Sequence, residues 1–216
     1  MQQVITLSAT YGAGGAAIGP ALALRLSLPF VDRAIPAAVA SEIGCSLDEA
    51  LMHDGRAEHG IGRIFAGAAR LPSVTLGGMD LYTPDATGRL LDEADFVART
   101  EQVLRDTARR SGGVILGRAA ACVLAGHPGA LHVRLDAPAD RRLARVRVES
   151  GEVDPRTLER RLTDNDRARA AYVKHFYRVD PADPRLYHLV LDPTALPDST
   201  VVEIIALAAE ARAVHA

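Results

Sequence analysis

Residues 4–18 read VITLSATYGAGGAAI, and the order of elements that this segment predicts is the strongest indication of the fold class. Val4 to Leu7 form a short β-branched apolar run typical of a buried strand, and residues 8–15 form a turn of small residues. A helical pattern follows from about Ala16 to Ser27, with apolar side chains four residues apart on one face. A strand, a glycine-rich turn and a helix in this order direct backbone N–H groups and the positive end of a helix dipole to one point. The stretch therefore predicts a site for a phosphate-like anion.

Beyond this stretch, short apolar strands alternate with helices. Further strands are predicted at residues 29–32, 114–116, 130–135 and 189–191, and further helices at residues 96–110, 138–149, 155–177 and 199–213. This alternation predicts a three-layer α/β/α domain with a five-stranded parallel sheet covered on both faces. Residues 34–95 carry many glycines and prolines, so we interpret them as a helical and loop insert within a single domain spanning 1–216.

Ligands of open parallel sheets bind beyond the carboxyl ends of the strands. In this chain those ends are residues 8–15, Asp32, the pair Gly117-Arg118, and Asp136. We therefore expect the chemistry to lie along one edge of the sheet, where these residues converge.

The composition excludes several classes of protein. The chain has 216 residues and a net charge of −2, which provides no basic field for a nucleic-acid backbone. Its cysteines, Cys45 and Cys122, are too few for a disulfide framework and indicate small apolar residues in a reducing compartment. No apolar run approaches the roughly 18 residues of a membrane span. We expect a cytoplasmic protein that binds neither nucleic acid nor membrane, with homo-oligomerisation left open.

Residues 5–18 resemble the opening of the cytidylate kinase-like proteins, bacterial relatives of cytidylate kinase among the P-loop nucleoside-monophosphate kinases. The resemblance continues in order through residues 28–32, 114–120, 131–138, 164–169 and 189–193. It spans most of the chain except residues 41–95. It implies a P-loop NTPase fold of the nucleoside-monophosphate kinase type.

The resemblance also implies roles for particular residues. The donor phosphates would be surrounded by Gly12, Ala13, Gly14, Gly15, Ala16 and Ala17. Asp32 and Arg118 would hold the acceptor, a small-molecule nucleotide. The catalytic arginines would be Arg142 and Arg145, in a lid-like segment at 138–170, together with Arg167 and Arg169. Such arginines suit phosphoryl transfer, which depends on positioning and on neutralising charge at the transferring oxygens. ATP or another nucleoside triphosphate, accompanied by Mg²⁺, would be the donor.

Simpler interpretations of these residues stay open. Asp32 could cap the following helix, and Arg118 could be a surface residue. The arginines between 141 and 147 could form a solvated helix face, and the charges at 164–169 could form local helix pairs.

One departure from the P-loop pattern G-x-x-x-x-G-K-[ST] bears on activity. Gly15 and Ala16 stand where the lysine and its neighbour are expected, and Ala17 stands where a hydroxyl would bind magnesium. The glycine is usual in the cytidylate kinase-like group. No protein ligand for a metal is evident. A cation about 4 Å from a phosphate contributes roughly 4 kcal/mol at a dielectric of 20. If this interaction acts only in the transition state, its loss costs about a thousandfold in rate. The candidates to replace it are Arg142, Arg145, Arg167, Arg169 and Lys174.

Three hypotheses follow. The first is a kinase that transfers phosphate from ATP to a nucleoside monophosphate or another small acceptor. The second is a catalytically weak or inactive module that senses a nucleotide or anion, because the P-loop lysine and hydroxyl are missing. The third is a structural homo-oligomer with a vacant glycine turn.

Overall fold

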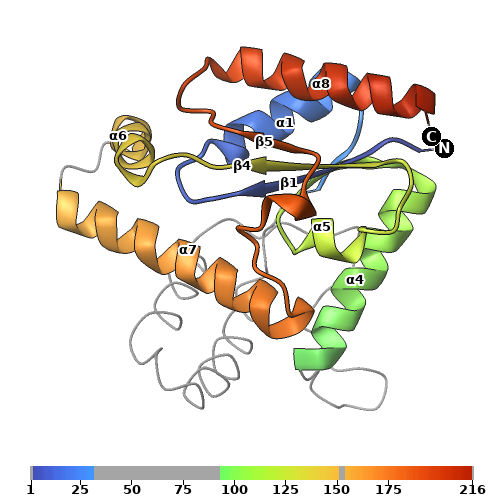
Figure 1. Cartoon of the computed structure of the whole chain (residues 1–216), viewed down its shortest axis with the longest axis horizontal. Helices are drawn as coiled ribbons and strands as arrows, with labels where there is room; N and C mark the ends of the chain where they lie inside the picture. Colours follow the sequence, from blue (N-terminus) through green and yellow to red (C-terminus); the bar gives the residue numbers. More distant parts are fainter. Residues whose placement is uncertain (1, 32–92, 151–153, 216) are drawn as a thin grey trace. The chain divides into compact units, whose positions relative to one another are not determined.

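A computed structural model describes residues 2–31, 93–150 and 154–215 of the chain (Figure 1). The chain divides into two compact units, Met1–Arg33 with Glu101–Ala216, and Ala34–Thr100. The sheet and the glycine-rich turn belong to the first unit. In the second unit only residues 93–100 are described, so most of the predicted insert at 34–95 lies outside the described residues.

One five-stranded parallel sheet forms the centre of the first unit, in the order β2-β3-β1-β4-β5. Figure 1 labels its strands β1, β4 and β5. Its strands are β1 (Val4–Ala9), β2 (Phe30–Val31), β3 (Gly113–Leu116), β4 (Ala130–Leu135) and β5 (Leu189–Leu191). The central strand β1 pairs with β3 from Val4 to Leu7 and with β4 along its whole length. The loop after β1 therefore leaves the sheet between the ends of two neighbouring strands, where several residues can reach it.

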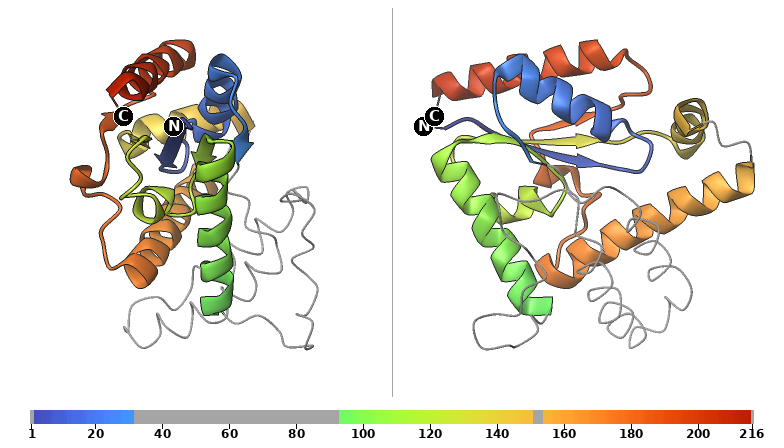
Figure 2. Two further views of the ribbon diagram at one scale, coloured as in Figure 1. Left: turned by 90° about the vertical axis from the view of Figure 1, so that its right-hand side faces the viewer. Right: turned by 180° about the vertical axis from the view of Figure 1, so that it is seen from behind.

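Helices cover both faces of this sheet (Figure 2). Helices α1 (Gly15–Leu26) and α8 (Asp198–His215) lie side by side on one face. The other side carries the second half of α4 (Glu93–Arg110), the short α5 (Ala120–Val123) and the long α7 (Pro155–Tyr177). Helix α6 (Ala139–Ser150) lies beyond the carboxyl end of β4, and a 3-10 turn, η1 (Pro184–Leu186), precedes β5. The three-layer α/β/α arrangement predicted from the sequence is confirmed.

The alternation of side chains along β1 produces two apolar cores. Under α1 and α8 the core includes Ile5, Leu7, Ile18, Leu22 and Ile205. Under α4 and α5 it includes Val4, Leu104, Ala108, Ile115 and Leu124. Fully burying one such large side chain contributes roughly 1.5–3 kcal/mol. Because both cores depend on β1, the strand that leads into the glycine-rich turn is firmly fixed.

Among the described helices, none combines the length and the apolar character needed to cross a bilayer.

Candidate functional site

The turn between β1 and α1 requires glycine at two positions. Gly12 and Gly14 adopt φ angles of 78° and 73°, in the left-handed region, and Gly14 is the N-cap of α1. A Cβ at Gly12 would lie 2.7 Å from Cγ2 of Val146, and one at Gly14 would lie 2.5 Å from Cζ of Arg145. The turn is therefore closely covered by residues of α6.

The backbone amides of the turn divide into two groups. The N–H groups of Thr10, Tyr11, Ala13 and Ala17 already donate within the protein, to Leu135 O, Asp166 Oδ1, Thr10 O and Gly14 O at 2.9–3.1 Å. No described residue accepts a hydrogen bond from the N–H groups of Gly12, Gly14, Gly15 or Ala16. Gly12 and Gly14 are half-buried, Gly15 is buried, and Ala16 is exposed at the helix start. The start of α1 thus presents unpaired donors together with the positive end of the helix dipole.

A closed ring of hydrogen bonds fixes the peptide groups of Tyr11. Asp166 of α7 accepts the Tyr11 N–H at 2.9 Å, and Arg142 of α6 donates to the Tyr11 carbonyl at 2.8 Å. Arg142 also pairs with Asp166 at 2.6 Å and donates from Nε to Ala137 O at 2.8 Å. Arg142 is only 7% exposed, so this predicted catalytic arginine lies buried beside the turn as part of its support.

Arg145 lies on the other side of the turn, against Gly14. Its guanidinium makes a two-pronged pair with Asp198 at the start of α8, at 2.8 and 2.6 Å, and its Nε donates to Glu149 at 2.7 Å. The hydrogen bonds that Arg145 donates to Asp198 hold the pKa of Arg145 above its ordinary value, although burial opposes them. Arg145 is therefore a permanently charged group held next to the unpaired amides.

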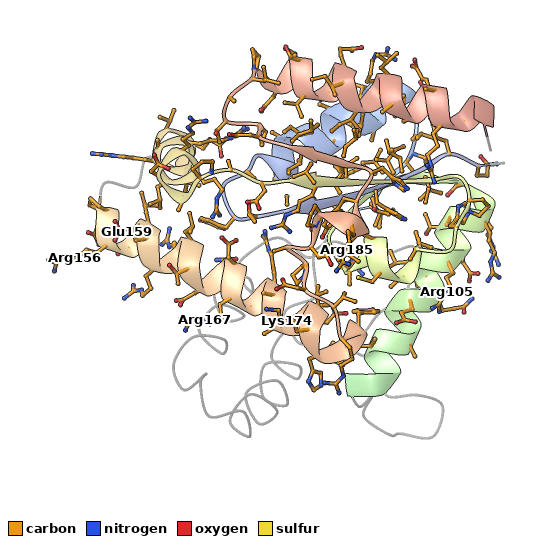
Figure 3. All side chains as sticks on the ribbon, in the orientation of Figure 1. Arg105, Arg156, Glu159, Arg167, Lys174 and Arg185 are labelled. Atoms are coloured by element: carbon orange, nitrogen blue, oxygen red, sulfur yellow. The ribbon has the colours of Figure 1, made fainter. Side chains whose placement is uncertain are left out.

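The remaining predicted cations differ in placement. Arg169 of α7 donates to the carbonyl of Ala9, the last residue of β1. Arg167 is exposed and projects from the side of α7 that faces away from the sheet (Figure 3). Lys174 pairs with Asp180 at 3.2 Å. The structure thus brings Arg142, Arg145 and Arg169 to the turn, and it does not bring Arg167 or Lys174 there.

Asp136, at the end of β4, is saturated by its neighbours. It accepts hydrogen bonds from Thr10 Oγ1 at 3.0 Å and from the Ala137 N–H at 2.9 Å, and it pairs with Arg134 at 2.8 Å. Arg134 is 8% exposed and also donates to Pro181 O at 2.6 Å. Asp136 therefore anchors the start of the turn and has little capacity left for a metal ion.

Of the two predicted acceptor residues, Arg118 lies among the described residues. Arg118 follows β3 on the same edge of the sheet, half-buried, with a φ of 57°. Its neighbours Gly117 and Ala119 also have positive φ angles, 79° and 50°, so the chain turns sharply at the carboxyl end of β3. Asp32 lies outside the described residues, and its role stays a prediction.

In the part of the chain that the structure describes, no group of His, Cys, Asp and Glu side chains could hold a metal ion. Burial raises the pKa of the half-buried Cys122 thiol, which disfavours the reactive thiolate. Cys45 lies outside the described residues.

Comparison with known proteins identifies the group to which this arrangement belongs. A family model described as the cytidylate kinase-like family matches residues 4–195. The chain belongs to the cytidylate kinase-like family. A cytidylate kinase from Methanopyrus kandleri is 28% identical over 158 residues, which cover 69% of this chain and 80% of that protein.

Solved structures support the fold of the family member. An uncharacterized protein from Eubacterium ventriosum has a TM-score of 0.65 at 18% identity, covering 97% of this chain and 99% of that chain. A gluconokinase from Sinorhizobium meliloti 1021 has a TM-score of 0.50 at 17% identity, covering 97% of this chain and 92% of that chain. The P-loop kinase-type fold predicted from the sequence is confirmed.

Sequence analysis of this cytidylate kinase-like chain missed several residues that shape the site. Asp198 reaches Arg145 from 53 positions away, and Tyr187 Oη lies 3.2 Å from Ser8 Oγ across 179 positions. Asp166 was interpreted only as a member of a local charge pair. These pairings depend on tertiary structure, and no periodic signal in the sequence marks them.

Proposed function

We propose that the chain binds a nucleoside triphosphate at the turn between β1 and α1 and transfers its terminal phosphate to a small acceptor, with a nucleoside monophosphate as the first candidate. The observation that carries the proposal is the set of amides at Gly12, Gly14, Gly15 and Ala16, at the N-terminus of α1, that have no acceptor among the described residues. Backbone amides at a helix N-terminus match the oxygens of a phosphate in both charge and geometry.

The arginines around the turn support phosphate chemistry. Arg145 lies against Gly14, and Arg169 reaches the end of β1 from α7. In phosphoryl transfer the protein contributes mainly positioning and fixed positive charge, and we assign this contribution to these two arginines. Arg142 and Asp166 would act by holding the turn, because their hydrogen bonds are directed to Tyr11 and to each other.

The donor set at the turn fits the polyphosphate of ATP better than it fits a metal ion. Ala16 and Ala17 have no hydroxyl, the Thr10 hydroxyl donates to Asp136, and Asp136 already accepts hydrogen bonds from its neighbours. Magnesium accompanying the triphosphate would therefore be held mainly by phosphate oxygens and water, where it would neutralise phosphate charge. The acceptor would lie toward Arg118, with Asp32 and Arg167 as further predicted contacts.

A second candidate function is a module that binds nucleotide and catalyses weakly or not at all. It is favoured by Gly15 and Ala16, which leave the turn without the lysine and the hydroxyl of the P-loop pattern.

A coupled assay of ADP release, with ATP and magnesium and each nucleoside monophosphate in turn, tests the first candidate. Acceptor-dependent turnover supports the kinase. Nucleotide binding without turnover on any acceptor supports the sensing module instead. Absence of both binding and turnover contradicts the proposal as a whole.

Ala16→Glu tests the site itself without threatening the fold. Ala16 is exposed in the first turn of α1, where a carboxylate stabilises the helix by about 0.3–1 kcal/mol. The same carboxylate would repel a phosphate at the neighbouring amides, so we expect ATP affinity to fall at least about tenfold while thermal stability is kept.

Ala16→Gln is the matched control, because it adds nearly the same volume without the charge. Isothermal titration should show a clearly smaller loss for this variant than for Ala16→Glu. Equal affinity in Ala16→Glu and the unaltered protein would show that phosphate does not bind at this helix start.

A further inference from the structure

Gly15 is glycine for a reason different from that of its neighbours. Gly12 and Gly14 need positive φ angles, but Gly15 does not, and it forms the first residue of α1. A Cβ at position 15 would lie 2.7 Å from the Cβ of Ala9 and 3.2 Å from Cδ1 of Leu116. Gly15 is therefore required by lack of space.

The obstacle at position 15 cannot easily move. The Ala9 methyl is attached directly to the backbone of the central strand β1, and Ala9 pairs in register with Leu135 of β4. The carbonyl of Ala9 also accepts a hydrogen bond from Arg169. Relief of the clash would require β1 to shift against β4, or the start of α1 to shift away from the sheet.

The contact between Ala9 and position 15 involves two positions of the P-loop pattern. When the lysine of G-x-x-x-x-G-K is placed at position 15, the two glycines of the pattern fall at positions 9 and 14. This chain keeps Gly14 but has Ala9, so the Cβ that is absent from the first position of the pattern is present here. The methyl group of Ala9 therefore occupies the space that the Cβ of a lysine at position 15 would need.

We propose that Ala9 and Gly15 form a matched pair that excludes a P-loop lysine, so that phosphate charge is met by the loop amides and by arginines from α6 and α7. Ala9 is thus the residue that determines which kind of phosphate loop this chain can form. The steric part of the proposal stands on the contact alone, whereas the part concerning phosphate rests on the proposed function.

A stability cycle with Gly15→Ala, Ala9→Gly and the double variant tests the steric part. At a helical position with ordinary φ, alanine is normally more stabilising than glycine. The clash predicts the opposite sign here, with Gly15→Ala lowering Tm by at least about 3 °C. In the Ala9→Gly background only the flexible Leu116 side chain remains close to position 15, so the same substitution should no longer lower Tm. A change in Tm of the same sign and size in both backgrounds would overturn the matched pair.

The double variant Ala9→Gly/Gly15→Lys tests the consequence for phosphate, with inorganic tripolyphosphate as the probe. We expect it to fold and to bind tripolyphosphate at least about tenfold more tightly than Ala9→Gly, because it gains a cation at the phosphate. Equal affinity of the two variants would overturn this part. If none of the proteins binds tripolyphosphate or ATP, the proposed function fails, while the stability cycle still decides the steric part.

Discussion

At the scale of single residues, His132 shows how the interior of this sheet constrains ionisation. His132 is 5% exposed, and its Nδ1 lies 2.8 Å from the hydroxyl of Thr6 on β1. Its ring stacks on His188 with centroids 5.0 Å apart. Burial lowers the pKa of His132 from 6.5 to about 4, and the nearby His188 and Arg212 act in the same direction. The folded protein therefore keeps this imidazole neutral.

This neutral histidine predicts loss of stability in mild acid. Between pH 6.5 and about 4 the unfolded chain binds a proton at His132 that the folded protein excludes, so the free energy of unfolding falls as the pH falls. The full effect is about 3 kcal/mol, reached near pH 4. Urea unfolding from pH 7 to 4.5 should show a flatter profile for His132→Gln, which keeps a polar side chain and cannot titrate. Parallel profiles would contradict the assignment.

Individual glycines were partly predictable from the sequence. The cluster at residues 12–15 indicated a phosphate turn, because glycine allows the backbone to turn its amides inward. The sequence does not distinguish the two reasons for glycine in this cluster. Gly12 and Gly14 adopt positive φ angles, whereas Gly15 leaves room for the methyl group of Ala9. That distinction depends on how α1 lies against β1, which only the folded structure shows.

At the scale of elements, α6 and α7 support the turn through a ring of side chains. Asp166 and Arg142 hold the Tyr11 peptide groups from both sides and pair with each other at 2.6 Å. The Arg142 side chain is 9% exposed and that of Asp166 is 25% exposed, so water replaces these interactions poorly. The ring does not involve the N–H groups of Gly14, Gly15 and Ala16, which have no acceptor among the described residues.

Asp166→Asn should therefore weaken the protein measurably. The amide oxygen can still accept the Tyr11 N–H, but the buried guanidinium of Arg142 loses its charged partner. We expect a loss of about 2–3 kcal/mol in the free energy of unfolding. Asp164→Asn, two residues earlier on α7 and half-buried, is the control, with an expected change within about 0.5 kcal/mol. Equal urea midpoints for the two variants would contradict the ring.

Most elements were predictable because their signals are local. Helix α7 has the predicted bounds, since Asp154 caps its first amides and Pro155 suits the first helical position. Strands β4 and β5 also have their predicted bounds, because their apolar runs are clearly delimited. Helix α5 and the turn η1 were missed, because elements of four and three residues are too short to show a period.

At the scale of the whole molecule, the strand order brings the site together from distant parts of the chain. Because β1 lies between β3 and β4 and the strands are parallel, the segments that follow these three strands share one edge of the sheet. The sequence predicted this convergence from the parallel sheet, and the family match supports the same fold. The strand order and the pairing partners of the arginines could not be predicted, because they depend on contacts between residues far apart in the chain.

Phosphate binding at the start of α1 can be observed at the amides themselves, in proton–nitrogen correlation spectra of the nitrogen-15-labelled chain titrated with ATP and magnesium. We expect the amide signals of Gly12, Gly14, Gly15 and Ala16 to shift most strongly and to saturate together, while those of Thr10 and Ala13, already bonded inside the protein, shift less. If the signals of Gly14 to Ala16 stay unchanged while ATP saturates another part of the chain, or if ATP causes no shift at all, phosphate does not bind at this helix start.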